Sequence, residues 1–166
     1  MPTSASASML IQVQAAVVGS SPVLGTLQGD MSNGATGARW TQGTGSGNID
    51  RVFRKNYTIA AAGTQSFNTL AAGSLTDIHA QAIDLDEIKG LMIKCVTGAI
   101  KVDAPATGFM GFFGSATDFI VLAAGQTLAL EFGATGLDVT TNSKFDLIDT
   151  AGGSGSTVEV AFFGAQ

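Results

Sequence analysis

The chain has 166 residues, of which 13% are charged and 45% hydrophobic, and its formal net charge is −5 at pH 7. Eight scattered Lys and Arg residues exclude nucleic acid as the main partner, because phosphate binding needs a basic patch. The mean hydropathy of +0.33 is high for a fully water-exposed surface, yet no run of about 20 apolar residues is present to span a membrane. We expect one domain, with or without a long appendage, whose surface is partly covered by other protein.

The first 50 residues carry only three charges and one aromatic residue, and such a segment cannot build much core. The sequence MLIQVQAAVV at positions 9–18 predicts one strand within it. No basic residue precedes Arg39, so this apolar run is not expected to be a signal peptide, and the chain should stay in the cytoplasm until assembly or release. We predict an extended N-terminal arm and connector over residues 1–48. The arm residues expected to contact neighbouring subunits are Leu10, Val13 and Trp40.

The stretch TQGTGSGN at positions 41–48 has the glycine content of a phosphate-binding loop. A dinucleotide fingerprint needs a third Gly where Asn48 stands, and a P-loop needs a Lys followed by Ser or Thr, which is missing. We therefore interpret the stretch as a joint between the arm and a body formed by residues 49–166.

From Arg51 onward the hydrophobic pattern alternates with a period of two, as half-buried strands require. In RVFRKNYTIA, Phe53 and Tyr57 fall on one face and Arg54 on the other. Similar short runs follow, separated by Gly, Ala, Asn, Asp, Ser and Thr: SFNTL, GLMIKCV, AIKVDA, GFMGFFG, DFIVLA, QTLALEF, KFDLID and TVEVAFFG. Many short strands at regular spacing predict an all-β antiparallel β-sandwich or barrel.

Three local patterns carry more detailed predictions. The segments YTIAAAG (57–63) and FIVLAAG (119–125) share an Ala-Ala-Gly ending, which predicts two related hairpins. The glycine stretch at 151–157 predicts a hairpin loop between the last two strands. The sequence DEIKG at 86–90 predicts a short helical turn.

Residues with catalytic chemistry are sparse. His79 is the only histidine, and its pairing with Asp77 is more typical of a strand-end contact than of a general base. Ser154 and Ser156 have no nucleophile-elbow context around them. We therefore predict that the protein is not an enzyme.

Metal and cofactor sites are also not expected. The acidic cluster of Asp84, Asp86 and Glu87 lacks the spacing and the glycine of a calcium loop, so capping of a helical turn is favoured over metal binding. Cys95 is the only cysteine, which excludes an internal disulfide, and it is expected to be a small buried hydrophobe. No cofactor is predicted.

The body resembles the small β-sandwich accessory proteins of tailed bacteriophage virions. The resemblance covers about residues 50–164 and leaves the arm unmatched. It is carried by LTD after the second strand, the IKGLMI strand, the Ala-Gly turn before a Leu-rich strand, and the closing FDLIDTAGGSGSTVEVAFFG. Such proteins are jelly-roll-like and act as capsid cement or decoration, or as parts of the tail.

The resemblance implies a structural virion protein, assembled in the host cytoplasm, that binds the major capsid protein or other virion proteins. A capsid cement or decoration subunit is the first hypothesis. The alternative is a tail-fibre or tail-tip module that recognises a host-surface glycan. A glycan reader needs exposed aromatic platforms in long loops, whereas the loops here are short and rich in Gly, Ala and Thr, which favours cement.

Adjacent phenylalanines predict a homo-oligomer. Phe112 and Phe113, like Phe162 and Phe163, are neighbours on expected strands and therefore point to opposite faces. One ring of each pair can enter the core, and the other needs a second apolar partner. We expect Phe163 and one of Phe112 or Phe113 at a subunit interface, with a trimer favoured by the resemblance; coverage by loops of the same chain is the alternative.

Overall fold

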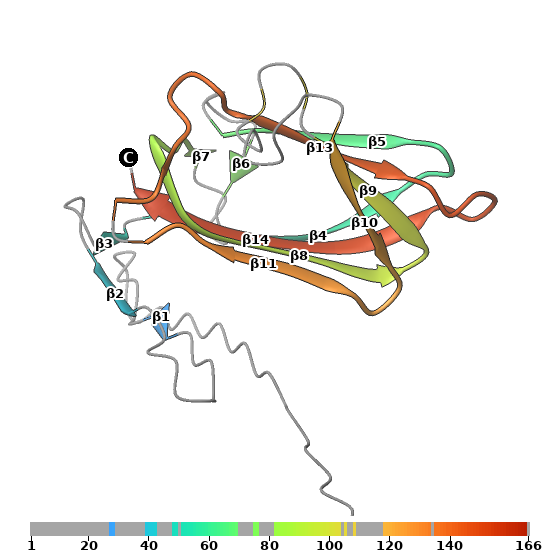
Figure 1. The fold of residues 1–166 in the computed structure, drawn as a ribbon, viewed down its shortest axis with the longest axis horizontal. Helices are drawn as coiled ribbons and strands as arrows, with labels where there is room; N and C mark the ends of the chain where they lie inside the picture. Colours follow the sequence, from blue (N-terminus) through green and yellow to red (C-terminus); the bar gives the residue numbers. More distant parts are fainter. Residues whose placement is uncertain are drawn as a thin grey trace, which may run out of the picture.

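The computed structural model describes residues 27–28, 39–42, 48–49, 51–69, 75–76, 82–103, 105, 108, 118–133 and 135–165. Within these ranges the chain is all-β and contains no helix. Two antiparallel sheets face each other as the layers of a sandwich (Figure 1).

The first sheet has the strand order β11-β8-β14-β4, and a short strand, β12, also pairs with β8. Its strands are β4 (Arg51–Ile59), β8 (Glu87–Thr97), β11 (Thr127–Glu131), β12 (Leu137–Asp138) and β14 (Ser156–Ala165). The second sheet has the order β10-β9-β13-β5. Its strands are β5 (Thr64–Asn68), β9 (Ala99–Asp103), β10 (Phe119–Ala123) and β13 (Lys144–Asp149).

The strands are connected along the chain in the order of a jelly roll. Leaving aside the short β12, the eight strands of the two sheets alternate between the sheets along the chain, except that β9 and β10 follow each other in one sheet. Two four-stranded sheets linked in this way form two Greek keys, which is the jelly-roll arrangement. The predicted fold class, an antiparallel jelly-roll-like β-sandwich, is confirmed.

The predicted hairpins are wrong. The turns after β4 and β10, and the glycine loop between β13 and β14, each carry the chain from one sheet to the other. Periodicity shows which side chains face the core, but it does not show which strand pairs with which. The two Ala-containing turns are nevertheless alike in structure. The Gly63 N–H donates to Ala60 O at 2.8 Å, and the Gln126 N–H donates to Ala123 O at 3.0 Å.

The helical turn predicted at 86–90 is also wrong, because β8 begins at Glu87. Ile88 lies between Leu137 of β12 and Gly164 of β14, so the backbone pairs on both sides. This pairing, together with full burial of Ile88, outweighs the local preference of the sequence. The acidic residues therefore do not cap a helix.

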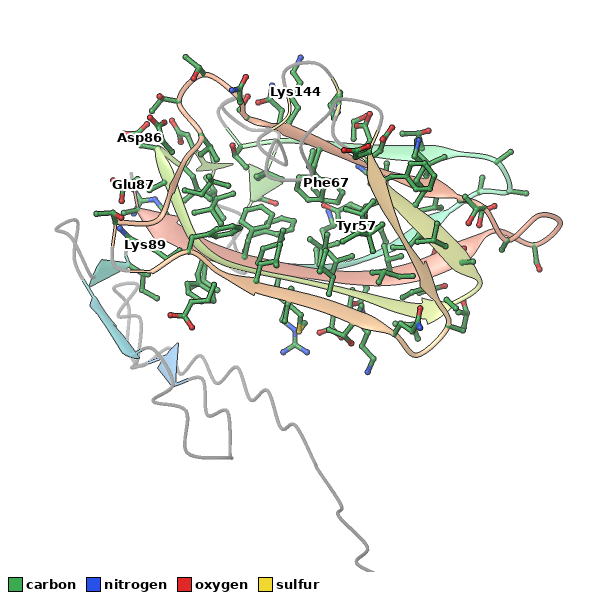
Figure 2. The ribbon with its side chains drawn as sticks, in the orientation of Figure 1. Tyr57, Phe67, Asp86, Glu87, Lys89 and Lys144 are labelled. Carbon is green, nitrogen blue, oxygen red and sulfur yellow. The ribbon has the colours of Figure 1, made fainter. Side chains whose placement is uncertain are left out.

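Aromatic rings form the centre of the core. Phe53 stacks on Phe162 within the first sheet at a centroid distance of 4.6 Å, and Phe67 stacks on Phe145 within the second at 4.4 Å. An edge contact of 6.5 Å between Phe53 and Phe67 joins the two sheets. Figure 2 shows Phe67 and Tyr57 between the layers. The prediction that Phe162 faces the core and Phe163 the outer side of β14 is confirmed, with Phe162 fully buried and Phe163 half-buried.

Short strands lie outside the sandwich. β1 (Leu27–Gln28) pairs with β2 (Arg39–Gln42), which runs parallel to β3 (Asn48–Ile49). β6 (Leu75–Thr76) pairs with β7 (Ala82–Ile83). The sequence had predicted a connector where β2 and β3 form.

Candidate interaction surface

The described residues contain no group of three or more His, Cys, Asp and Glu side chains that could hold a metal ion. Ser156 is buried, and its hydroxyl lies 2.5 Å from Asp149 Oδ1 and 3.0 Å from Ala99 O, so it is unavailable as a nucleophile. Ser154 lies in the exposed loop after β13. His79 and Asp77 lie outside the described residues. In the part of the chain that the structure describes, no helix is long and apolar enough to cross a membrane.

The buried carboxylate of Asp149 accepts hydrogen bonds from the turn after β4 and from the start of β14. Besides the Ser156 hydroxyl, its carboxylate accepts the Ala62 N–H at 3.0 Å. The bond from Ser156, followed by those from backbone N–H groups, holds the pKa of Asp149 below its ordinary value despite the opposing effect of desolvation. Burial, followed by the Asp149 charge, raises the pKa of the Cys95 thiol. The prediction that Cys95 is a buried hydrophobe is confirmed.

Lys89 is a fully buried cation at the start of β8. Its Nζ lies 2.5 Å from Glu87 Oε2, and the Glu87 side chain is 42% exposed. Figure 2 shows both side chains at the end of the sandwich where β8 begins. A buried lysine needs such a partner, since an unpaired charge in the interior is costly. We interpret this pair as structural.

The most unusual surface of the described body is the outer side of β10. Phe119 is 51% exposed and Val121 is 50% exposed, and the third large exposed hydrophobic residue, Val96, lies on β8. The strand register places Phe119 opposite Asp103 and Val121 opposite Lys101 on β9. The Lys101 ammonium lies 4.5 Å from the Phe119 ring centroid and 3.2 Å from Asp103 Oδ1, so a single ion pair borders the apolar row.

β10 is also a sheet edge, and the four edge strands differ in protection. β4 carries Arg51, Arg54 and Lys55, β11 ends in Glu131, and β5 reads TQSFN. β10 reads FIVLA, without a charged or polar side chain. Edge strands usually carry charges, proline or bulges that prevent pairing with other chains. Among the described strands, none pairs with β10 on the side away from β9.

Phe163 of β14 lies on the outer side of the first sheet, where its ring covers Gly90 of the adjacent strand β8. The register pairs the two residues, and a Cβ added at Gly90 would come within 2.3 Å of the ring. The ring thus has a contact within its own chain, with a strand and not with the loops that the alternative expectation named, and it stays partly exposed. Its place at a subunit interface stays a prediction.

Of the other predicted interface residues, only Trp40 belongs to a strand that the structure describes. Leu10, Val13, Phe112 and Phe113 lie outside the described residues, while Trp40 lies in β2 opposite Leu27. Phe119 and Val121 were missed as interface candidates. The available signal was that all five residues of FIVLA are apolar, which is unusual for a half-buried strand with alternating faces.

Comparison with known proteins gives little further information. No family model and no curated protein matches the sequence. Among solved structures, a chain from work titled "Bacillus endospore appendages form a novel family of disulfide-linked pili" is similar, at 17% sequence identity and a TM-score of 0.33. The match covers 74% of this chain and 92% of that chain. A TM-score of this size does not establish a common fold.

Proposed function

We propose that the protein is a structural subunit of a larger assembly, and specifically a capsid cement or decoration subunit of a tailed-phage virion that binds neighbouring capsid proteins. The observation that carries the structural role is the uncharged, half-exposed edge strand β10 on a body with few charges. Exposed apolar residues at an edge mark a surface that another protein covers. The virion setting comes from the sequence resemblance.

The chemistry of the body agrees with a non-catalytic role. Its buried residues Asp149, Ser156 and Lys89 are engaged in contacts within the chain: Asp149 with Ser156, and Lys89 with the partly exposed Glu87. Of the partly exposed aromatic rings in the described body, Tyr57 and Phe132 pack against the core. This leaves half-exposed Phe119, which contacts Lys101, and half-buried Phe163, which covers Gly90. Neither ring lies in a long loop with amide or carboxylate side chains, as a glycan site would require.

Localisation on particles tests the proposal. Virions produced from the genome that encodes this chain are purified and examined by mass spectrometry and by cryo-electron microscopy. We expect stoichiometric amounts of the chain and jelly-roll density on the outer surface of the capsid. Its absence from particles would overturn the proposal, and density only at the tail tip combined with glycan binding by the purified protein would favour the tail-module alternative.

A further inference from the structure

The edge of β10 has the properties of an acceptor for an additional strand. It offers five consecutive residues without a charge, and both of its faces are apolar: Phe119 and Val121 lie on the outer side, while Ile120 and Leu122 face the core. In strand addition, backbone hydrogen bonds to an open edge provide affinity, and alternate side chains provide specificity. A charged or strongly polar strand would leave the apolar row uncovered.

A segment with matching chemistry lies earlier in the same sequence. Residues 9–18, MLIQVQAAVV, contain no charge, and the alternate positions Ile11, Val13 and Ala15 form a wholly apolar row. The eight described strands of the jelly roll all lie between Arg51 and Ala165 and do not include this segment. The chain therefore contains an uncharged segment predicted to form a strand in addition to these eight, and the described strands leave the uncharged β10 edge without a partner.

The position of the segment favours a partner in a neighbouring subunit. β1 to β3 lie beyond the end of the sandwich at which β14 ends, and β10 lies toward the opposite end (Figure 1). The interval between residues 18 and 27 is about nine residues and extends at most about 30 Å. Because β1 to β3 lie at the end of the body away from β10, an adjoining copy offers a β10 edge that can be reached without spanning the length of the same sandwich.

We propose that residues 9–18 of one subunit add as a strand to the β10 edge of a second copy of this chain. Such donation is heterologous, so it closes into a ring where the rotation between subunits permits and otherwise continues as a filament. The inference does not depend on where the assembly is located. If donation fails, a cement role through another surface is still possible, and if the chain is absent from virions, donation can still occur.

Two full-length variants separate donor from acceptor. Val13→Pro removes a backbone donor from the middle of the proposed strand and leaves β10 intact. Val121→Lys places a cation on the edge, next to Lys101, and leaves residues 9–18 intact. Val96→Lys is the matched control, since Val96 is another large exposed apolar residue but lies outside β10. If Val121→Lys loses its β circular dichroism, Phe119→Lys, opposite Asp103, replaces it.

Sedimentation velocity and light scattering over a range of concentrations provide the readout. We expect the wild type and Val96→Lys to form multiples of the 16.8 kDa chain, and each of the other variants alone to be monomeric. An equimolar mixture of Val13→Pro and Val121→Lys should form a pair of twice 16.8 kDa, because one working donor meets one working acceptor.

The remaining outcomes overturn the proposal. A wild type that stays monomeric shows that residues 9–18 do not bind the β10 edge of a second copy. Association of Val13→Pro at the wild-type level shows that β10 binds something other than residues 9–18, such as β10 of a second copy. A mixture that remains monomeric, with both variants folded, shows that the two elements do not bind each other.

Discussion

Residues 51–63 and 119–126 occupy comparable places in the two halves of the jelly roll. Each is an edge strand followed by a turn that crosses to the other sheet. In the first, the strand is charged and its turn has Ala62 at a φ of 55°; in the second, the strand is uncharged and its turn has Gly125 at a φ of 83°. The same topology thus allows one edge strand to carry protecting charges while the other carries none.

The largest contrast is expected between two phenylalanines of these edge strands. Phe53→Ala removes a ring that is 1% exposed and stacked on Phe162, so it should lower the free energy of unfolding by about 3–5 kcal/mol. Phe119→Ala removes a half-exposed ring and a contact with Lys101, which should cost at most about 1 kcal/mol. Urea unfolding at low protein concentration measures both. Equal costs would mean that Phe119 belongs to the core.

Acid should affect the first turn more than the second. The Ala62 N–H donates to the Asp149 carboxylate, whereas the Ala123 N–H donates to the amide oxygen of Gln126. Because the folded pKa of Asp149 is lowered, its contribution to stability is present above the unfolded value of about 3.9 and is lost as the pH falls through the lower folded value.

Amide hydrogen exchange and NMR titration between neutral pH and pH 2 test this difference. Protection at Ala62 should fall below about pH 4 while that at Ala123 persists until global unfolding. Asp149→Asn is the control, and it should flatten the pH dependence of the unfolding free energy in this range. Parallel loss at both turns in the wild type would contradict the role of Asp149.

The two turns should also respond in opposite directions to exchange of Ala and Gly. Gly125→Ala meets no atom within 4 Å, so its expected cost of about 1 kcal/mol comes from the positive φ alone. Ala62→Gly relieves the same strain and should stabilise the protein by about 0.5 kcal/mol, because the greater freedom of Gly in the unfolded chain offsets part of the gain. Thermal unfolding of both variants checks the signs. Destabilisation by Ala62→Gly would show that Ala62 is not strained.

The smallest effect on the stability of the monomer is expected at Lys55. This exposed cation sits on the core-facing side of β4, and its Nζ lies 5.4 Å from the Tyr57 ring centroid. Lys55→Val should change the unfolding free energy by less than about 0.5 kcal/mol. It should nevertheless increase self-association, since the edge loses an inward-pointing charge. Light scattering compares it with Lys144→Val, which removes an exposed cation from the non-edge strand β13. Unchanged association would mean that other features protect β4.

The sequence by itself determined most strands of the sandwich and their buried faces. The positions of Val158, Val160 and Phe162 at every second residue identified β14 with Phe162 inward and Phe163 outward, because only one side of each sheet meets the core. The isolated Cys95 was likewise recognised as buried. The chemistry of a site could not be derived from these patterns, since they report packing.

Only the tertiary structure decided which strands pair and which lie at edges. Three connections that cross between the sheets were predicted as hairpins, because the residues of a turn encode its bend and not the sheet that the next strand joins. DEIKG became a strand since β12 and β14 pair with it on both sides. FIVLA appeared as an ordinary core strand until the strand order placed it at an edge. Long-range pairing, which no local pattern contains, thus determines the open surface from which the proposed assembly follows.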